Sequence, residues 1–204
     1  MYRRIETAGG DPAAVQVVAV TKGFGPDAVT AAADAGLTDV GENYAQELVA
    51  KAAAVSQSVR WHFLGGLQRN KIPALAPVVD RWDSVARVAE GEAIARRQPA
   101  AEVLVEVDLS GAPGRNGVAP ADVPDVVTAL ADMGLVVRGL MAVAPRDGPA
   151  RPAFKTVREL ADQLGLPERS MGMSADLEDA VAEGSTTVRI GRALFGDRPQ
   201  GSAR

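Results

Sequence analysis

Short apolar runs rich in β-branched residues alternate along this chain with longer, alanine-rich amphipathic stretches. The runs are apolar throughout instead of at every second residue, which is typical of parallel strands that are covered on both faces. We expect eight strands, at Val15–Val20, Thr38–Gly41, Arg60–Leu64, Val79–Asp83, Glu102–Val107, Val136–Met141, Arg169–Met171 and Thr187–Ile190. An alternation of this kind predicts a parallel α/β fold.

The amphipathic stretches between these runs are predicted to be helices. Pro26 and Pro120 stand where a proline suits the first turn of a helix, and glycines such as Gly36 and Gly134 stand where a helix would end. The expected helices are Pro26–Ala35, Tyr44–Val55, Asn70–Leu75, Val85–Arg97, Pro120–Met133, Ala150–Leu164 and Ala175–Glu183.

The number of strands favours a closed barrel over an open doubly wound sheet, although the alternation itself permits both. A (β/α)8 barrel of the TIM type needs about 200 residues at minimum, and this chain has 204. At roughly 150 residues per domain, the length suits one domain. We therefore predict a single barrel domain over residues 1–204, with loose ends at 1–11 and 199–204.

The composition excludes several classes of function. A formal net charge of −4 gives no reason to expect nucleic acid or a membrane surface as a partner. The absence of cysteine excludes disulfides and thiolate catalysis, and the single histidine, His62, is too few for a multi-histidine metal site, so no metal is expected. The first residues lack the apolar core of a signal peptide, and no apolar run approaches the ~18–20 residues of a membrane span. A cytoplasmic protein is expected.

Lys22 is the most informative candidate residue. It directly follows the apolar run Val15–Val20 and Thr21, and the active face of such a barrel lies at the carboxyl ends of its strands. Partial burial at a barrel mouth lowers the pKa of a lysine and makes its amine available as a nucleophile for Schiff-base chemistry. The plainer interpretation is a lysine whose ammonium reaches water at a strand end, and spacing alone favours it.

Ser174, Gly191 and Arg192 form a second constellation. The stretch after Ser174 begins a predicted helix with acidic residues in its first turn. Ser174 is therefore either an ordinary N-cap residue or one ligand of a phosphate at a helix N-terminus. Gly191 would allow the backbone to approach the same phosphate, and phosphate sites after strands seven and eight recur in this class of barrel.

Other motifs carry less weight. Gly172–Asp176 resembles the G-x-S-x-G nucleophile elbow, but an aspartate replaces the last glycine, and His62 precedes the serine, which is the wrong order for a hydrolase triad. Gly23–Gly25 lacks the third glycine of a dinucleotide fingerprint. Three acidic residues near strand ends have no spacing that demands a divalent ion. We expect them to be solvated or paired with arginine: Glu42, Glu106 and Asp108.

Seven motifs occur in an order that resembles a known family. They are Val18–Lys22, Gly41–Glu47, Trp61–Gly65, Leu67–Lys71, Gly139–Pro145, Ser170–Ser174 and Val188–Gly191. Any one of them is weak evidence, but seven in order across nearly the whole chain are highly specific. The set resembles the pyridoxal 5′-phosphate (PLP) homeostasis protein family.

The resemblance implies a PLP-binding barrel similar to the N-terminal domain of alanine racemase, without that enzyme's second domain. It implies that PLP is held as a reversible Schiff base on Lys22. Ser174 and the backbone of Gly191 and Arg192 would hold the phosphate, and Arg189 would face the pyridine nitrogen. The remaining members of the implied site lie near the cofactor: Asn43, Met141 and, more loosely, His62.

The implied function is to buffer and deliver PLP, without robust catalysis. An arginine such as Arg189 cannot give up its proton, so it would keep the ring nitrogen unprotonated and weaken the ring as an electron sink. A racemase also needs a second acid or base, and the only tyrosines, Tyr2 and Tyr44, come with no second domain to deliver them. We expect a monomer whose partners are PLP and PLP-dependent apoenzymes. The alternatives are a fold type III PLP enzyme, such as a residual amino-acid racemase or a lyase, and a phosphate-binding barrel for another metabolite.

The chain departs from the family pattern in two places. Gly66 stands where the family usually has a histidine, so a polar contact after the third strand is missing. Few residues precede Val15, whereas the family usually begins with a full helix. We therefore expect the bottom or one flank of the barrel to be left uncovered.

Overall fold

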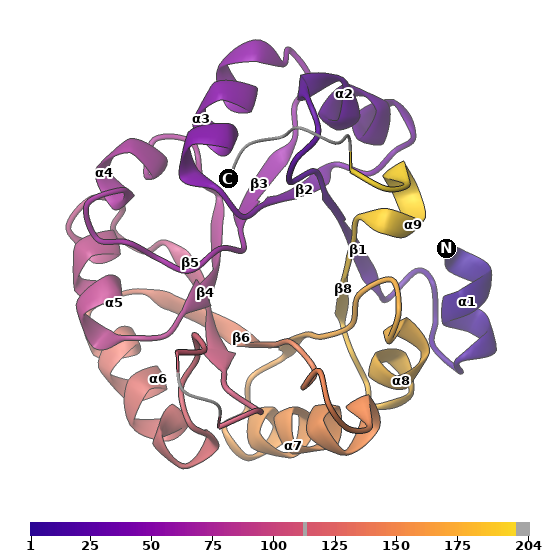
Figure 1. Cartoon of the computed structure of the whole chain (residues 1–204). Helices are drawn as coiled ribbons and strands as arrows, with labels where there is room; N and C mark the ends of the chain where they lie inside the picture. Colours follow the sequence, from indigo (N-terminus) through magenta and orange to yellow (C-terminus); the bar gives the residue numbers. More distant parts are fainter. Residues whose placement is uncertain (112–113, 199–204) are drawn as a thin grey trace.

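The computed structural model describes residues 1–111 and 114–198, and it contains a closed barrel of eight parallel strands (Figure 1). The strands pair in chain order, and the last strand pairs with the first. Their bounds are β1 Gln16–Val20, β2 Asp39–Glu42, β3 Arg60–Phe63, β4 Arg81–Val85, β5 Glu102–Val107, β6 Val136–Ala142, β7 Glu168–Ser170 and β8 Thr187–Ile190. The predicted (β/α)8 barrel is confirmed. The alternative prediction of an open doubly wound sheet is wrong.

Helices surround the barrel as an outer ring (Figure 1). Their bounds are α1 Tyr2–Thr7, α2 Pro26–Asp34, α3 Ala45–Ala54, α4 Ile72–Leu75, α5 Val88–Ala95, η1 Pro120–Asp122, α6 Val123–Asp132, α7 Ala150–Gln163, α8 Leu177–Ala182 and α9 Arg192–Phe195. Every predicted helix is present, with bounds slightly narrower than predicted. Within the described ranges, no helix is long and apolar enough to cross a membrane.

The strand β4 begins two residues later than predicted. The sequence pattern favours the apolar Val79 as the start of this strand, whereas the structure places the charged Arg81 there, and both Arg81 and Asp83 are buried. Arg81 Nε donates to Asp83 Oδ1 at 2.8 Å, and Arg81 Nη1 donates to Glu168 Oε2 at 2.7 Å. Charged side chains that are paired in this way can be buried inside a barrel. A strand prediction that relies on apolar residues therefore misses them.

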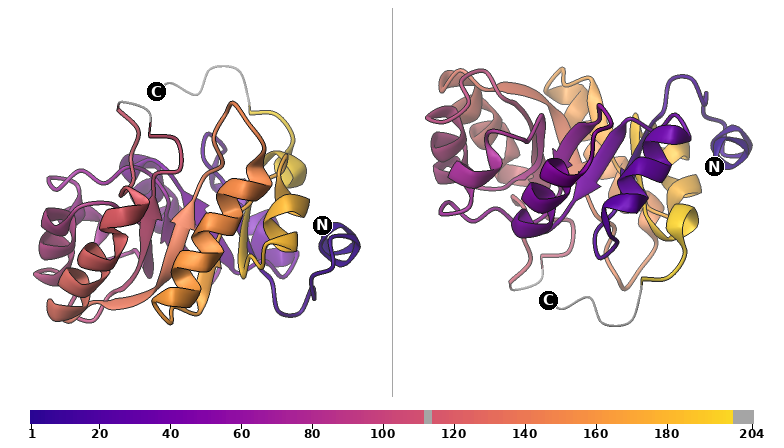
Figure 2. Two further views of the ribbon diagram at one scale, coloured as in Figure 1. Left: turned by 90° about the horizontal axis from the view of Figure 1, so that it is seen from below. Right: turned by 90° about the horizontal axis from the view of Figure 1, so that it is seen from above.

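The N-terminal end is ordered, contrary to the prediction that residues 1–11 are loose. Helix α1 buries Ile5 completely, and Arg4 donates hydrogen bonds of 2.6 and 2.7 Å to the two carboxylate oxygens of Glu178 on α8. Figures 1 and 2 show α1 outside the barrel on the side of α8. This flank is therefore covered, although the chain has few residues before β1. The other predicted loose end, 199–204, lies outside the described residues.

A network of buried charges lies inside the barrel around His62 on β3. The fully buried imidazole has Nε2 at 2.9 Å from Asp39 Oδ1 and Nδ1 at 3.4 Å from Asp83 Oδ1. Burial alone would lower the pKa of His62, but the charge of Asp83 and the contacts with both aspartates outweigh it and raise the pKa. Although burial opposes the shift, His62 and Arg81 hold the pKa of Asp83 well below its ordinary value.

The raised pKa of His62 predicts how stability changes with pH. Because the folded-state pKa lies above the ordinary 6.5, protonated His62 stabilises the fold below that pH, and the contribution is lost as pH rises through the folded-state value. The substitution His62→Asn should therefore reduce the free energy of unfolding more at about pH 6 than at about pH 9. Urea unfolding followed by circular dichroism measures both losses. An equal or larger loss at the higher pH would contradict the ion-paired histidine.

Candidate functional site

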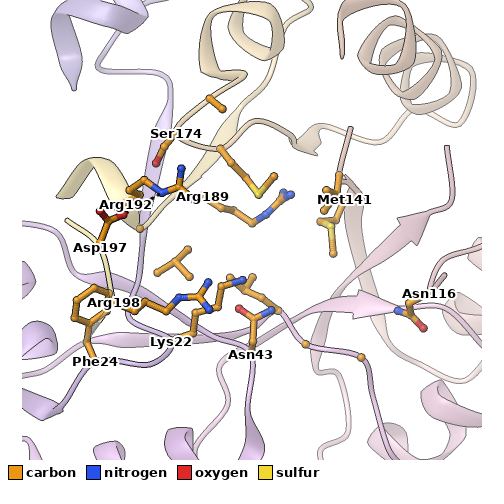
Figure 3. A pocket seen from close by; sticks show the side chains of 18 of the residues that line it. Lys22, Phe24, Asn43, Asn116, Met141, Ser174, Arg189, Arg192, Asp197 and Arg198 are labelled. Carbon is orange, nitrogen blue, oxygen red and sulfur yellow. Dashed lines mark ion pairs between the residues drawn. The ribbon is translucent and has the colours of Figure 1, made fainter. Parts of the chain in front are cut away.

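A cavity of about 690 Å³ opens at the carboxyl ends of the strands (Figure 3). Its volume lies within the range of about 300–1,000 Å³ that is typical of small-molecule sites. Most of the predicted site residues line it: Lys22, Asn43, Met141, Ser174, Arg189, Gly191 and Arg192. They come from strands near both ends of the chain, so closure of the barrel is what brings them together.

Lys22 lies two residues beyond the end of β1, and its side chain points into the cavity (Figure 3). Burial lowers the pKa of its amine below the ordinary 10.5, and the positive charges of Arg198 and Arg189 lower it further. Glu42 opposes this shift in part. A lower pKa increases the fraction of uncharged amine, which is the nucleophilic form. The position favours the chemical interpretation of Lys22 over that of a lysine that merely reaches water.

Ser174 lies beside the first turn of α9 and not at the start of α8. The N-cap residue of α8 is Asp176, so the interpretation of Ser174 as an ordinary N-cap is wrong. Asp176 Oδ1 accepts a hydrogen bond of 2.6 Å from the backbone amide of Met173. Ser174 Oγ instead accepts a hydrogen bond of 3.2 Å from the backbone amide of Ala193 in α9. A hydroxyl group next to the amides that begin a helix suits an anionic group.

Gly191 precedes α9 and lets the backbone pass close to β1. A Cβ atom at this position would lie 3.1 Å from the carbonyl oxygen of Val20, which is a tight contact. The first amides of a helix have no acceptor within the helix. In α9 the amide of Ala193 donates to Ser174 Oγ, so in the described structure it is the amide of Arg192 that can serve an anion at the barrel mouth. Figure 3 shows Ser174 and Lys22 on different sides of the same cavity. The cavity thus has one end suited to an anion and another that carries an amine.

Arg189 on β8 is buried, and its guanidinium group is held by three acceptors. Nη1 donates to the carbonyl oxygen of Ser170 at 2.6 Å and to Ser170 Oγ at 2.8 Å, while Nη2 donates to the carbonyl oxygen of Ala142 at 2.8 Å. Burial lowers the pKa of Arg189, and the charges of Asp83 and Glu106 oppose this effect. An arginine stays protonated in proteins. Arg189 therefore presents a fixed cation to the cavity that it lines.

Asn43 follows β2 and brings its side chain next to Lys22 (Figure 3). Its buried Oδ1 atom has no hydrogen-bond partner in the described part of the protein. A buried polar atom without a partner is costly, so this is a position where a bound ligand could supply a donor. Gly65 packs against the backbone of Asn43, because a Cβ atom at Gly65 would lie 1.9 Å from the Asn43 carbonyl oxygen.

Gly66 lines the same cavity but has open space around it. No described atom other than those of its chain neighbours lies within 4 Å of the position that a Cβ atom would take. A side chain could therefore be accommodated here, in contrast to Gly65. Because Gly66 has no side chain, the cavity is open at this point.

Sequence reasoning missed further residues that line the cavity, namely Phe24, Glu106, Asn116, Met173, Asp197 and Arg198. The predicted pairing of Glu106 with arginine is absent from the described structure, where its half-buried carboxylate accepts a hydrogen bond from Asn116 Nδ2. Burial raises the pKa of this carboxyl group. Glu106 could have been found from the sequence, because it is an acidic residue within the otherwise apolar run of β5. Asn116 lies in the loop after β5, where the local sequence has no feature that indicates a cavity residue.

His62 does not line the cavity, and its predicted place beside the cofactor needs correction. It lies deeper in the barrel, between Asp39 and Asp83. The prediction rested on its position near the end of the third strand. The local sequence does not show that carboxylates from the two neighbouring strands would surround its side chain.

The fold and the cavity place the protein in the class of alanine racemase-like barrels. A family model described as "Alanine racemase, N-terminal domain" matches residues 2–199. The pyridoxal phosphate homeostasis protein of Pseudomonas aeruginosa is 40% identical over 97% of this chain and 90% of its own length. The protein of the same name from Deinococcus radiodurans is 42% identical over 92% of each chain.

A solved structure gives the same result. PipY of Synechococcus elongatus, determined with PLP bound, is 32% identical and superposes with a TM-score of 0.82 over 96% of this chain and 99% of that chain. The chain belongs to the pyridoxal phosphate homeostasis protein family.

Proposed function

We propose that the protein binds PLP reversibly in this cavity and buffers it or delivers it to PLP-dependent apoenzymes. The observation that carries the proposal is that one cavity combines a half-buried lysine amine with a separate end suited to a phosphate. PLP carries an aldehyde and a phosphate as separate substituents of one ring. The names of the relatives and the PLP bound to PipY support the same ligand for this chain.

Each residue of the proposed site has chemistry that suits one part of PLP. The amine of Lys22 would form the Schiff base with the aldehyde. The hydroxyl of Ser174 and the backbone of Gly191 and Arg192 would hold the phosphate. Arg189 would face the pyridine nitrogen. The remaining proposed neighbours of the ring are Asn43 and Met141.

Two features support carriage of PLP over catalysis. Arg189 is a fixed cation, so a ring nitrogen beside it stays unprotonated and withdraws electrons only weakly. Neither tyrosine lines the cavity, since Tyr44 precedes α3 and is 45% exposed, and Tyr2 lies in α1. Within the described residues, the cavity therefore has no tyrosine that could serve as the second acid or base of a racemase. A site at the barrel mouth is also within reach of water and free amines, which suits reversible binding.

The substitution Lys22→Ala should abolish the visible absorption band that a Schiff base gives with PLP, because alanine has no amine. The matched control is Lys155→Ala, which removes an exposed lysine of α7 and should keep the band. Titration of each purified protein with PLP, followed by absorbance, measures the effect. A band that is unchanged in Lys22→Ala would contradict the proposal.

One observation favours the alternative of a fold type III PLP enzyme. Glu106 lines the cavity from β5, and a carboxyl group with a raised pKa is able to act as an acid or base. If the protein is a carrier, the PLP-loaded form should exchange the Cα proton of L-alanine in deuterated water no faster than free PLP does. Proton NMR measures the exchange. Rapid exchange that is lost in Glu106→Gln would support the enzyme and contradict the carrier.

A further inference from the structure

Lys51 is a buried lysine that the proposed PLP site does not contain. It belongs to α3, is only 4% exposed, and reaches the loop at the end of β1. Lysine on an outer helix normally extends its ammonium group into water. Burial of that charge is costly unless its donors are paired. The partners of Lys51 therefore indicate what the residue does.

All three donors of the Lys51 ammonium group have acceptors. Nζ donates to the backbone carbonyl oxygen of Thr21 at 2.8 Å and to Glu47 Oε2 at 3.1 Å, and it also binds Glu42 Oε1. Glu42 is fully buried. The prediction that Glu42 is solvated or paired with arginine is thus wrong, since a lysine takes the place of the arginine. We call Glu42, Glu47 and Lys51 the buried charge cluster.

The two carboxylates of the buried charge cluster also hold the backbone on both sides of Lys22. Thr21 Oγ1 donates to Glu42 Oε1 at 3.1 Å, and the backbone amide of Gly23 donates to Glu47 Oε2 at 2.9 Å. The residue before Lys22 and the residue after it are therefore bound to the same cluster. The side chain of Lys22 itself is left free to extend into the cavity.

The cluster also holds the second loop of the site. Glu42 Oε2 accepts a hydrogen bond of 3.0 Å from the backbone amide of Asn43, whose side chain lines the cavity. Lys51 and Glu47 join α3 to the ends of β1 and β2, and Glu42 joins those two strand ends to each other. Ser174 and Gly191, at the phosphate end of the proposed site, belong to other segments: Ser174 follows β7, and Gly191 lies between β8 and α9. None of the hydrogen bonds of the buried charge cluster given above involves either residue.

We propose that Lys51 is a positioning residue for Lys22, because it fixes the Thr21 carbonyl directly and the Gly23 amide through Glu47. The inference rests on the proposed function, which supplies the aldehyde that Lys22 meets. Bond formation between an amine and an aldehyde depends on their alignment, and a displacement of about 1 Å can cost on the order of a hundredfold. Binding of a phosphate at Ser174 does not depend on that alignment.

The test compares two ligands that differ only at the reacting group. Pyridoxine 5′-phosphate has the ring and the phosphate of PLP but an alcohol in place of the aldehyde. In Lys51→Met we expect the affinity for PLP to fall about tenfold, while the affinity for pyridoxine 5′-phosphate stays within about twofold of wild type. Absorbance titration measures the first affinity and calorimetry the second. An equal loss for both ligands would show a merely structural role and overturn the inference.

A second variant controls for loss of stability, because Lys51→Met leaves the buried carboxylate of Glu42 without its cation and could destabilise the fold. Lys51→Met/Glu42→Gln removes both charges and keeps an oxygen acceptor for Thr21. If this variant unfolds at the wild-type temperature and still loses affinity only for PLP, the inference holds. If it binds both ligands as wild type does, the inference is wrong. Lys155→Met, at an exposed lysine, should bind both ligands normally.

The same experiment separates failure of this inference from failure of the proposed function. Wild-type protein that binds neither ligand would contradict the proposed function and this inference with it. Wild-type protein that binds both ligands, together with equal losses in Lys51→Met, would contradict only the positioning role.

Discussion

Pairing between β1 and β8 closes the sheet, and the candidate site depends on that closure. The register places Ala19 opposite Ile190, so the segments that follow, with Lys22 on one side and Gly191 on the other, emerge next to each other at the barrel mouth. In an open sheet these first and last strands would be edge strands, and the lysine would not share a cavity with the start of α9. A main-chain pairing between the two ends of the sequence thus creates a site that no local segment contains.

Two clusters of buried charge, one around His62 inside the barrel and one around Lys51 on α3, are balanced by close partners of opposite sign. Around His62 the partners are aspartates from neighbouring strands, and around Lys51 they are Glu42 and Glu47. Buried ion pairs add little net stability, but loss of one partner typically costs about 3–5 kcal/mol, so such groups hold a specific geometry. In the described part of the chain, Lys22 and Arg198 have no carboxylate within ion-pair distance, which leaves positive charge in the cavity for an anionic ligand.

Much of the fold could be predicted, because strands covered on both faces leave uninterrupted apolar runs in the sequence. The errors come from contacts between distant residues. Arg81 begins β4 because its buried charge is paired with Glu168 of β7, and Ile5 is ordered because α1 packs against α8. In the site, Lys22 and Ser174 could be predicted because both follow the carboxyl ends of predicted strands. The local sequence could not place His62, whose partners lie on other strands, or Asn116, which reaches the cavity from a loop.

The central claim is that one amine of this chain bonds to the aldehyde of PLP, and mass spectrometry tests it directly. Borohydride reduces a Schiff base to a stable secondary amine, so PLP-loaded protein can be reduced, digested and mapped. The sequence has only a few lysines that could carry the product: Lys22, Lys51, Lys71 and Lys155. We expect the phosphopyridoxyl mass on Lys22 alone. Absence of that mass from Lys22, or its presence on another lysine instead, would contradict the claim.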